Sequence, residues 1–101
     1  MNRLQFSRLA RRDLASIGRF TVDNWGENQA VHYLKQIDDC CRLLCAQPMV
    51  GRPCNQIARG LMRKETGKHV IVYKNLDETV LVCRVLHQST LPGGRDFDDN
   101  R

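Results

Sequence analysis

The chain has 101 residues, of which 42% are hydrophobic and 27% are charged, and its formal net charge is +5. This length allows a single domain with a modest core and excludes a multidomain enzyme, while the composition excludes an intrinsically disordered chain. The excess of sixteen Lys and Arg over eleven Asp and Glu favours an acidic partner, either nucleic acid or an acidic protein.

Nothing in the sequence resembles a membrane span or a signal peptide. No apolar run approaches the roughly 18 residues that indicate a membrane span, and the first six residues lack the continuous apolar stretch of a signal peptide. We therefore expect a cytoplasmic protein that does not bind a membrane. The cysteines are odd in number and form no CxxC pair, so we expect reduced thiols, no metal site and no cofactor. They are Cys40, Cys41, Cys45, Cys54 and Cys83.

The beginning of the chain predicts a short strand and a helix. Apolar and polar residues alternate around Leu4 and Phe6, which indicates a strand with one buried face, and Ser7 is suited to cap a helix after it. Apolar residues then recur at spacings of three and four from Arg8 to about Trp25, a pattern typical of a helix that packs on a core. The predicted core-facing positions are Ala10, Leu14, Ile17, Thr21 and Trp25, with Leu9 and Phe20 at the margin of the stripe.

A second helix is predicted from about residue 27 to residue 47, where Pro48 ends it. Only a short joint at Gly26 separates the two helices, and glycine readily adopts the backbone conformation that ends a helix. The helices should therefore fold back on each other as an antiparallel hairpin. The segment from Pro48 to Gly60 is rich in proline and glycine and predicts an ordered loop.

Three strands are predicted in the second half of the chain, rich in β-branched residues and bounded by turn residues. They are Leu61–Thr66, His69–Tyr73 and Thr79–His87. Gly67 and a turn at residues 75–78 would join them as two antiparallel hairpins. We expect residues 1–88 to form the single domain, and residues 89–101, which show no periodicity, to form a flexible tail.

The predicted order is strand, helix, helix, strand, strand, strand, which indicates an α+β fold. The helix hairpin should cover one face of a small, mainly antiparallel sheet, because both layers must bury an apolar side. The other face would remain partly open, and we expect the functional residues to lie there.

The sequence shows no convincing catalytic centre. No serine lies in a nucleophile motif, and the glycine pair at residues 93–94 lacks the spacing of a phosphate-binding loop. A nuclease could use the strand histidines if a carboxylate and cationic groups stood nearby. The set for such a nuclease would be His69, His87, Arg63, Arg84 and Glu65. Because Glu65 is the only acidic residue in this region, we assign no catalytic residue and keep a nuclease as the alternative.

Basic residues of the strands and of the first helix are the candidates for binding a partner. Arg63 and Arg84 lie in otherwise apolar strands, so each must face the less buried side or meet an anion. Two interpretations remain open: a solvated outer sheet face, or a surface whose guanidinium groups bind carboxylate or phosphate. The basic first helix could likewise touch nucleic acid or merely keep itself soluble. The binding candidates are Arg63, Lys64, His69, Arg84, His87, Arg11 and Arg12.

Several motifs, in this order, resemble those of the ParE toxins of the RelE/ParE superfamily. Residues 11–21, RRDLASIGRFT, are similar to the first-helix pattern of the family, and Asn24-Trp25-Gly26 resembles its joint between the helices. Residues 47–73 resemble the family's N-P-x-x-G-x-P segment and the G-x-R and G-x-H-x-I-x-Y strands that follow it. Residues 82–87, VCRVLH, resemble its last strand. The resemblance runs from about residue 4 to residue 88.

This resemblance implies a compact toxin of a type II toxin–antitoxin system that poisons DNA gyrase and inhibits growth. It also implies a hetero-oligomer with a ParD-like antitoxin, whose C-terminal segment wraps around the helix hairpin and the sheet. We do not expect the toxin alone to bind DNA sequence-specifically.

Two alternatives come with the same superfamily. RelE-type relatives cut ribosome-bound mRNA with basic and acid–base residues on the same sheet, but Val70 stands where some of them place an arginine. The other alternative is a degenerate toxin that only binds antitoxin, because the tail after Gln88 ends in acidic residues and departs from the basic tails of many relatives.

Overall fold

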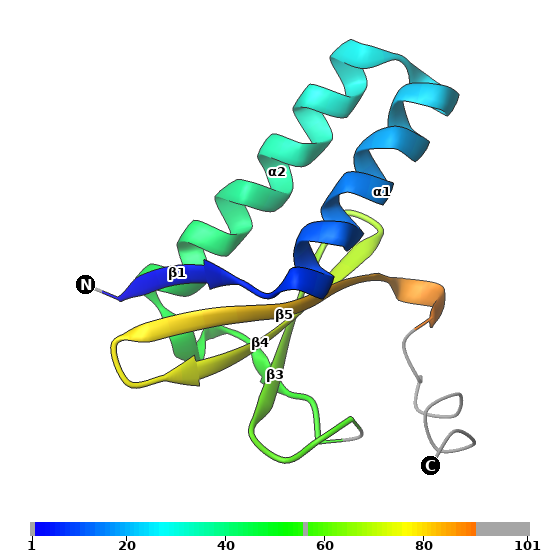
Figure 1. The fold of residues 1–101 in the computed structure, drawn as a ribbon. Helices are drawn as coiled ribbons and strands as arrows, with labels where there is room; N and C mark the ends of the chain where they lie inside the picture. The colour runs from blue at the N-terminus through cyan, green and yellow to red at the C-terminus, as the bar shows by residue number, and fades with distance from the viewer. Residues whose placement is uncertain (1, 56, 91–101) are drawn as a thin grey trace.

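A computed structural model describes residues 2–55 and 57–90 and confirms the α+β architecture expected from the sequence. Two helices pack on one side of a five-stranded sheet (Figure 1). In chain order the elements are β1 (Arg3–Phe6), α1 (Arg8–Trp25), α2 (Glu27–Ala46), the short 3-10 helix η1 (Pro48–Val50), β2 (Arg52–Pro53), β3 (Leu61–Thr66), β4 (His69–Leu76), β5 (Thr79–His87) and the 3-10 helix η2 (Gln88–Thr90). Within the described residues, no helix is long and apolar enough to cross a membrane.

The strand order in the sheet is β1-β5-β4-β3-β2. β1 pairs parallel to β5 and every other pair is antiparallel, so the sheet is mainly antiparallel as expected. The sequence did not predict the short strand β2 or the extension of β4 from Tyr73 to Leu76. The short helix η2 (Gln88–Thr90) contains the first two residues of the expected tail, Ser89 and Thr90. Residues 91–101 lie outside the described part of the chain, so the flexibility of the tail stays a prediction.

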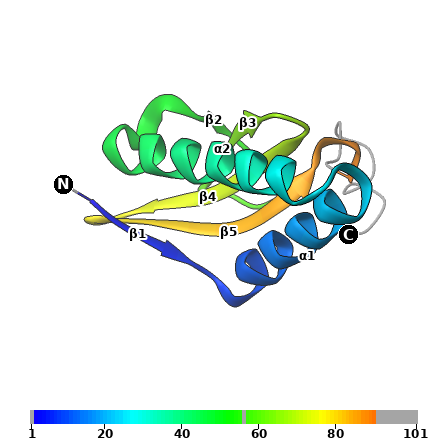
Figure 2. The ribbon, with the colours of Figure 1, turned by 90° about the horizontal axis from the view of Figure 1, so that it is seen from above.

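A hydrophobic core fills the space between the helix hairpin and one face of the sheet (Figure 2). Both helices place residues there at spacings of three, four and seven, as the periodicity of an amphipathic helix requires. The fully buried members are Ala10, Ile17, Ile37, Cys41 and Leu44 from the helices and Ile71, Tyr73, Val80, Val82 and Val85 from β4 and β5. Burial raises the pKa of the Cys41 thiol to about 12, so this side chain acts as a small apolar group.

Tyr73 attaches the turn from Pro48 to Gly51 to this core. Its hydroxyl donates to the carbonyl of Pro48 at 2.7 Å and accepts the N–H of Gly51 at 3.2 Å, which gives a buried phenol its partners. A Cβ on Gly51 would lie 2.7 Å from the carbonyl oxygen of Arg63, so only glycine allows the backbone to come this close. The loop rich in proline and glycine is ordered for these reasons.

The opposite face of the sheet has a small core of its own. Its fully buried members are Cys54, Leu61, Val70 and Val72, with Ile57, Cys83 and Leu86 packed against them. Residues 54–55 and 57–60 run on this side of the sheet, away from the helices (Figure 1), and the N–H of Cys54 donates to the carbonyl of Leu61 at 2.7 Å. The loop therefore covers part of the face that was expected to remain partly open.

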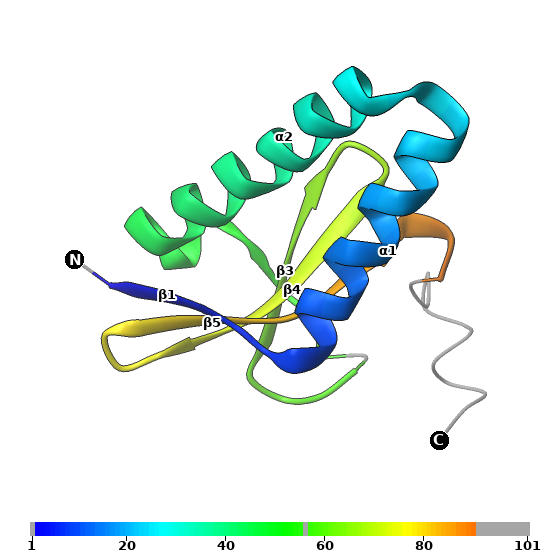
Figure 3. The ribbon, with the colours of Figure 1, turned by 45° about the horizontal axis from the view of Figure 1, so that its top comes forward.

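The helix hairpin extends past the sheet at its Gly26 end (Figure 3). Trp25, which was predicted to face the core, is in fact 72% exposed. Phe20 and Leu9, on the margin of the predicted stripe, are also exposed, Phe20 by 65%. The prediction was wrong for Trp25 because the sheet ends before α1 does, and helical spacing carries no information about where the neighbouring layer ends.

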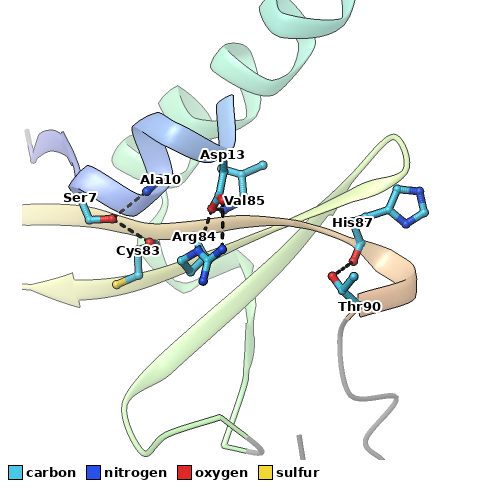
Figure 4. A network of polar contacts seen from close by, with 8 residues as sticks. All are labelled: Ser7, Ala10, Asp13, Cys83, Arg84, Val85, His87 and Thr90. Atoms are coloured by element: carbon cyan, nitrogen blue, oxygen red, sulfur yellow. Dashed lines mark hydrogen bonds and ion pairs between the residues drawn. The ribbon is translucent and has the colours of Figure 1, made fainter. Parts of the chain in front are cut away.

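Ser7 connects β1, α1 and β5 where β1 leaves the sheet (Figure 4). Its backbone N–H donates to the carbonyl of Val82 at 2.9 Å, and its hydroxyl donates to the carbonyl of Cys83 at 2.7 Å. The same hydroxyl accepts the N–H of Ala10 at 3.0 Å, which confirms Ser7 as the N-cap of α1. One serine therefore fixes the start of the helix on the edge of β5.

Further along α1, Asp13 accepts hydrogen bonds from the next residues of the β5 edge (Figure 4). One of its carboxylate oxygens accepts the backbone N–H of Val85 at 2.9 Å, and the two oxygens together accept two guanidinium N–H groups of Arg84 at 2.8 and 3.0 Å. The Asp13 side chain is only 16% exposed. Beyond β1, β5 has no strand on this side, so the carboxylate replaces the hydrogen bond that a neighbouring strand would make.

We expect Asp13→Ala to lower the free energy of unfolding by about 2 kcal/mol, because hydrogen bonds to a partly buried charge are lost and the N–H of Val85 loses its partner. Urea unfolding followed by circular dichroism measures this. The matched control is Asp38→Ala, which removes an exposed helical ion pair with Arg42 and should change stability little. Equal effects of the two substitutions would contradict the role given to Asp13.

Candidate binding site

The residues proposed from the sequence fall into two groups on opposite faces of the sheet. His69 lies opposite His87 on the helix-covered face, two residues from the core pair Ile71 and Val85. Arg63 and Arg84 both lie opposite Val72 on the other face, and Glu65 lies opposite Val70 there. The expectation that histidines and arginines share one open face is therefore wrong.

A β-bulge in β5 produces this separation. The pairing of β4 with β5 passes from Tyr73 opposite Val82 to Val72 opposite Arg84, so Cys83 is an extra residue. Uninterrupted pairing would have placed Arg84 opposite Ile71, in the core, and His87 on the face away from His69. The extra residue reverses both placements, and the sequence pattern gave no sign of it.

The arginines of the loop face are paired with carboxylates. Arg63 donates to Glu65 at 2.8 and 3.1 Å, and Arg52 donates to the same carboxylate oxygen. Burial opposes ionisation of Glu65, but hydrogen bonds from Arg63 and Arg52 outweigh it and lower the pKa of the carboxyl group. Arg84 is paired with Asp13. A carboxylate or phosphate of a partner would have to compete with these pairs.

The other basic candidates lie apart from both groups. Arg11 and Arg12 are exposed on α1, and Lys64 is half-buried in β3 on the face covered by α2, near Cys40. Within residues 2–55 and 57–90, none of these three side chains forms an ion pair or a hydrogen bond. Their role in binding an antitoxin or a target stays a prediction.

The histidines line a pocket of about 560 Å³ between the end of the helix hairpin and the end of the sheet. Four segments of the chain, from residue 20 to residue 87, contribute side chains to the pocket. They are Phe20, Thr21, Asn24 and Trp25 of α1, Gln29 and Tyr33 of α2, Lys68 and His69 at the start of β4, and His87 at the end of β5. Among the residues that the structure describes, no Asp or Glu lines the pocket.

Tyr33 fixes the orientation and the tautomer of His69. The phenol oxygen accepts the backbone N–H of Lys68 at 3.0 Å, so its own proton is available to Nδ1 of His69 at 2.6 Å. Neutral His69 then carries its proton on Nε2. Burial, reinforced by the neighbouring His87, lowers the pKa of His69, while Asp13 opposes the shift. The lowered pKa favours the neutral ring, and within residues 2–55 and 57–90 its Nε2–H has no hydrogen-bond partner.

The Nδ1 atom of His87 is hydrogen-bonded too, by Ser89. Its Nδ1 accepts the backbone N–H of Ser89 at 3.1 Å and lies 2.8 Å from the Ser89 hydroxyl, so the proton of the neutral ring is on Nε2. The two imidazoles meet edge to face, with their centroids 5.3 Å apart. The pocket therefore presents two imidazole N–H donors next to the lysine side chain of Lys68.

Gly67 permits this packing at the turn between β3 and β4. Its φ of +58° favours glycine, and a Cβ there would lie 2.6 Å from a ring carbon of Tyr33. The side-chain amide of Gln88 donates to the carbonyl of Gly67 at 3.0 Å. The turn is thus held from both the helix and the end of β5.

Sequence reasoning identified two of the pocket residues, His69 and His87, but not their neighbours. Trp25 was assigned to the core, and Phe20 to the margin of the same stripe, because both fit an apolar helical pattern. Tyr33 packs partly against the core, and its hydroxyl is hydrogen-bonded at the edge of the pocket. The available signal was the number of aromatic and amide residues clustered around the joint at Gly26.

We expect acid to destabilise the fold through His69. Its folded-state pKa lies below the ordinary 6.5, so the unfolded chain binds the proton more tightly. The stability contributed by neutral His69 is fully present above pH 6.5 and is lost as the pH falls from there towards the folded-state pKa. The midpoint of urea unfolding should therefore decrease between about pH 7.5 and about pH 5.5.

In His69→Gln this decrease should become smaller, whereas His32→Gln, at an exposed position of α2, should retain it. An unchanged pH dependence in His69→Gln would contradict the assignment.

Comparison with known proteins identifies the family. A model of the "ParE toxin of type II toxin-antitoxin system, parDE" matches residues 4–92. Toxin ParE1 of Mycobacterium tuberculosis is 35% identical over 88 residues, which cover 86% of this chain and 90% of that protein. Toxin ParE1 of Caulobacter vibrioides is 32% identical over 89 residues, covering 88% and 92%.

Solved structures share the fold. A chain of the chromosomal ParDE toxin–antitoxin system from P. aeruginosa has a TM-score of 0.76 at 20% identity and covers 86% of this chain and 96% of its own. A chain of the toxin–antitoxin complex RelBE2 from Mycobacterium tuberculosis has a TM-score of 0.64 at 25% identity, covering 85% and 96%. The resemblance found in the sequence motifs is thus confirmed, and the chain belongs to the ParE family of toxins of type II toxin–antitoxin systems.

Proposed function

We propose that this toxin acts by binding DNA gyrase and poisoning it, without chemistry of its own, and that a ParD-like antitoxin neutralises it. Membership of the ParE family supports the first part. The observation that carries the proposal is the separation of His69 and His87 from Arg63, Arg84 and Glu65 by the thickness of the sheet. Surfaces for binding are present on both faces, but the set of residues that a nuclease would need is divided between them.

Three further observations argue against the endoribonuclease alternative. Glu65, the nearest candidate for a base, accepts hydrogen bonds from two arginines and has a lowered pKa, so it is a weak proton acceptor. Nδ1 of His69 is occupied by the Tyr33 hydroxyl. Val70, where some relatives place an arginine, is buried in the core on the loop face.

Exposed apolar side chains support a protein partner. Near the hairpin end, Phe20, Trp25 and Val31 are each more than 60% exposed, and Met49 is 72% exposed near the other end of α2. Apolar surface of this kind on a small protein commonly marks an interaction site. Two similar structures, ParDE and RelBE2, are by their names toxin–antitoxin systems. An antitoxin segment that follows the hairpin would cover these side chains.

The charge of the chain supports an acidic or nucleic-acid-bound target. Arg8, Arg11, Arg12 and Arg19 are exposed along α1, and the formal net charge is +5. A positively charged helix next to exposed aromatic residues suits a surface that meets both protein and DNA phosphate, as a gyrase–DNA complex would offer.

Purified toxin should inhibit negative supercoiling by gyrase and increase the amount of cleaved plasmid, and an equimolar ParD-like antitoxin should reverse both effects. Gel electrophoresis of relaxed plasmid after incubation with gyrase and ATP measures this. Circular dichroism of the same sample establishes that the toxin is folded. Unchanged supercoiling with folded toxin at high micromolar concentration would contradict the gyrase proposal.

Two parallel measurements separate the alternatives. In-vitro translation followed by mapping of mRNA ends should show no new cleavage, and codon-specific cuts would instead identify an endoribonuclease. Expression in cells without antitoxin should arrest growth, whereas unaffected growth would identify a degenerate toxin that only binds antitoxin.

A further inference from the structure

We propose that the pocket at the end of the helix hairpin binds one unstacked nucleotide of a single-stranded nucleic acid. The base would lie among the aromatic side chains of Phe20, Trp25 and Tyr33, and its phosphate or base oxygens would meet Lys68 and the two histidines. The site lies on the helix side of the sheet, away from the arginines of the loop face. It requires neither gyrase nor the ribosome to form, so it is a property of the toxin itself.

The size and the walls of the pocket fit a nucleotide. Its volume of about 560 Å³ lies within the range of sites that enclose small molecules. Phe20 and Trp25 are mostly exposed although both are large and aromatic, and both belong to the last two turns of α1, next to Gly26. Exposed aromatic rings beside a cationic groove are the common means of binding unstacked bases, because every base has a face that can stack.

The polar groups of the pocket fit the edges and the charge of a nucleotide. Nδ1 of each histidine is already hydrogen-bonded, so Nε2–H of His69 and His87 are the groups left to donate to an oxygen. The amide nitrogen of Asn24 donates to the carbonyl of Phe20 at 2.8 Å, which leaves its amide oxygen as an acceptor. Side-chain amides recognise the mixed donors and acceptors of a base edge.

Charge complementarity favours an anionic ligand. Lys68 is exposed, and no carboxylate is among the described residues that line the pocket. An apolar side chain of a protein partner would leave the imidazole and amide groups without partners, which is costly when the pocket closes over them. A nucleotide uses the rings, the amides and the cation together.

Trp25 makes the proposal directly measurable, because it is the only tryptophan of the chain. Titration of the full-length toxin with short single-stranded oligonucleotides should quench or shift its fluorescence to saturation. Duplex DNA of the same sequence should change it little, because its bases are stacked. Deoxyribose and ribose oligonucleotides are compared in parallel, and the tighter of the two identifies the source of the nucleotide.

Matched variants separate the pocket from general attraction to a basic protein. Phe20→Ala should weaken binding of a labelled oligonucleotide at least about fivefold, since stacking on one ring is lost, while Val31→Ala, equally exposed but outside the pocket, should not. Lys68→Ala should weaken binding more than Lys35→Ala, which removes the same charge from exposed α2. All four positions are at the surface, and thermal melts establish that the variants fold.

Three results would overturn the proposal. Equal losses for Lys68→Ala and Lys35→Ala would show general electrostatic binding only, and equal responses to single and double strands would exclude base recognition. Quenching of Trp25 by an acidic, aromatic peptide but by no oligonucleotide would make the pocket a protein-binding site. Because gyrase is absent from every sample, these outcomes are independent of the supercoiling assay.

Discussion

The carboxylate of Asp13 joins α1 to the stretch of β5 that no strand covers, and the arrangement of the two layers depends on this contact. An edge N–H beneath a helix must find a partner, because water has limited access to it. Asp13 provides one for Val85 and neutralises Arg84 with the same group. Together with Ser7 it fixes both the start and the direction of α1, which then passes beyond the end of the sheet and forms one wall of the pocket.

The extra residue in β5 sets what each face of the sheet carries. With Cys83 unpaired, Arg84 turns to the loop face beside Val72, and His87 turns to the helix face beside His69. A single insertion in the ladder thus moves one cation out of the core and brings the second imidazole into the pocket. The ion pair between Asp13 and Arg84 lies next to this β-bulge. The guanidinium charge that the bulge keeps out of the core is therefore neutralised at the edge of the sheet.

Charge and apolar surface are distributed unevenly over the molecule. The arginines beside the loop face, Arg52, Arg63 and Arg84, lie next to Glu65 or Asp13, whereas the exposed arginines of α1 and Lys68 have no ion-pair partner among the described residues. Four of the exposed apolar side chains belong to the Gly26 end of the helix hairpin: Phe20, Val22, Trp25 and Val31. The donor-rich pocket shares Phe20 and Trp25 with this exposed apolar surface.

The sequence by itself determined the element order, the two amphipathic helices, the antiparallel hairpins of β3, β4 and β5 and the family, because period and turn residues are local properties. It also supplied His69 and His87 as candidates. Only the tertiary structure decided that Phe20 and Trp25 are exposed, that β1 lies parallel to β5 and that histidines and arginines are on opposite faces. These features depend on where the sheet ends beneath the helix hairpin and on the extra residue, Cys83, in the pairing of β5 with β4. The contact beside this extra residue joins Asp13 to Arg84 across 71 positions of sequence, and no local pattern encodes it.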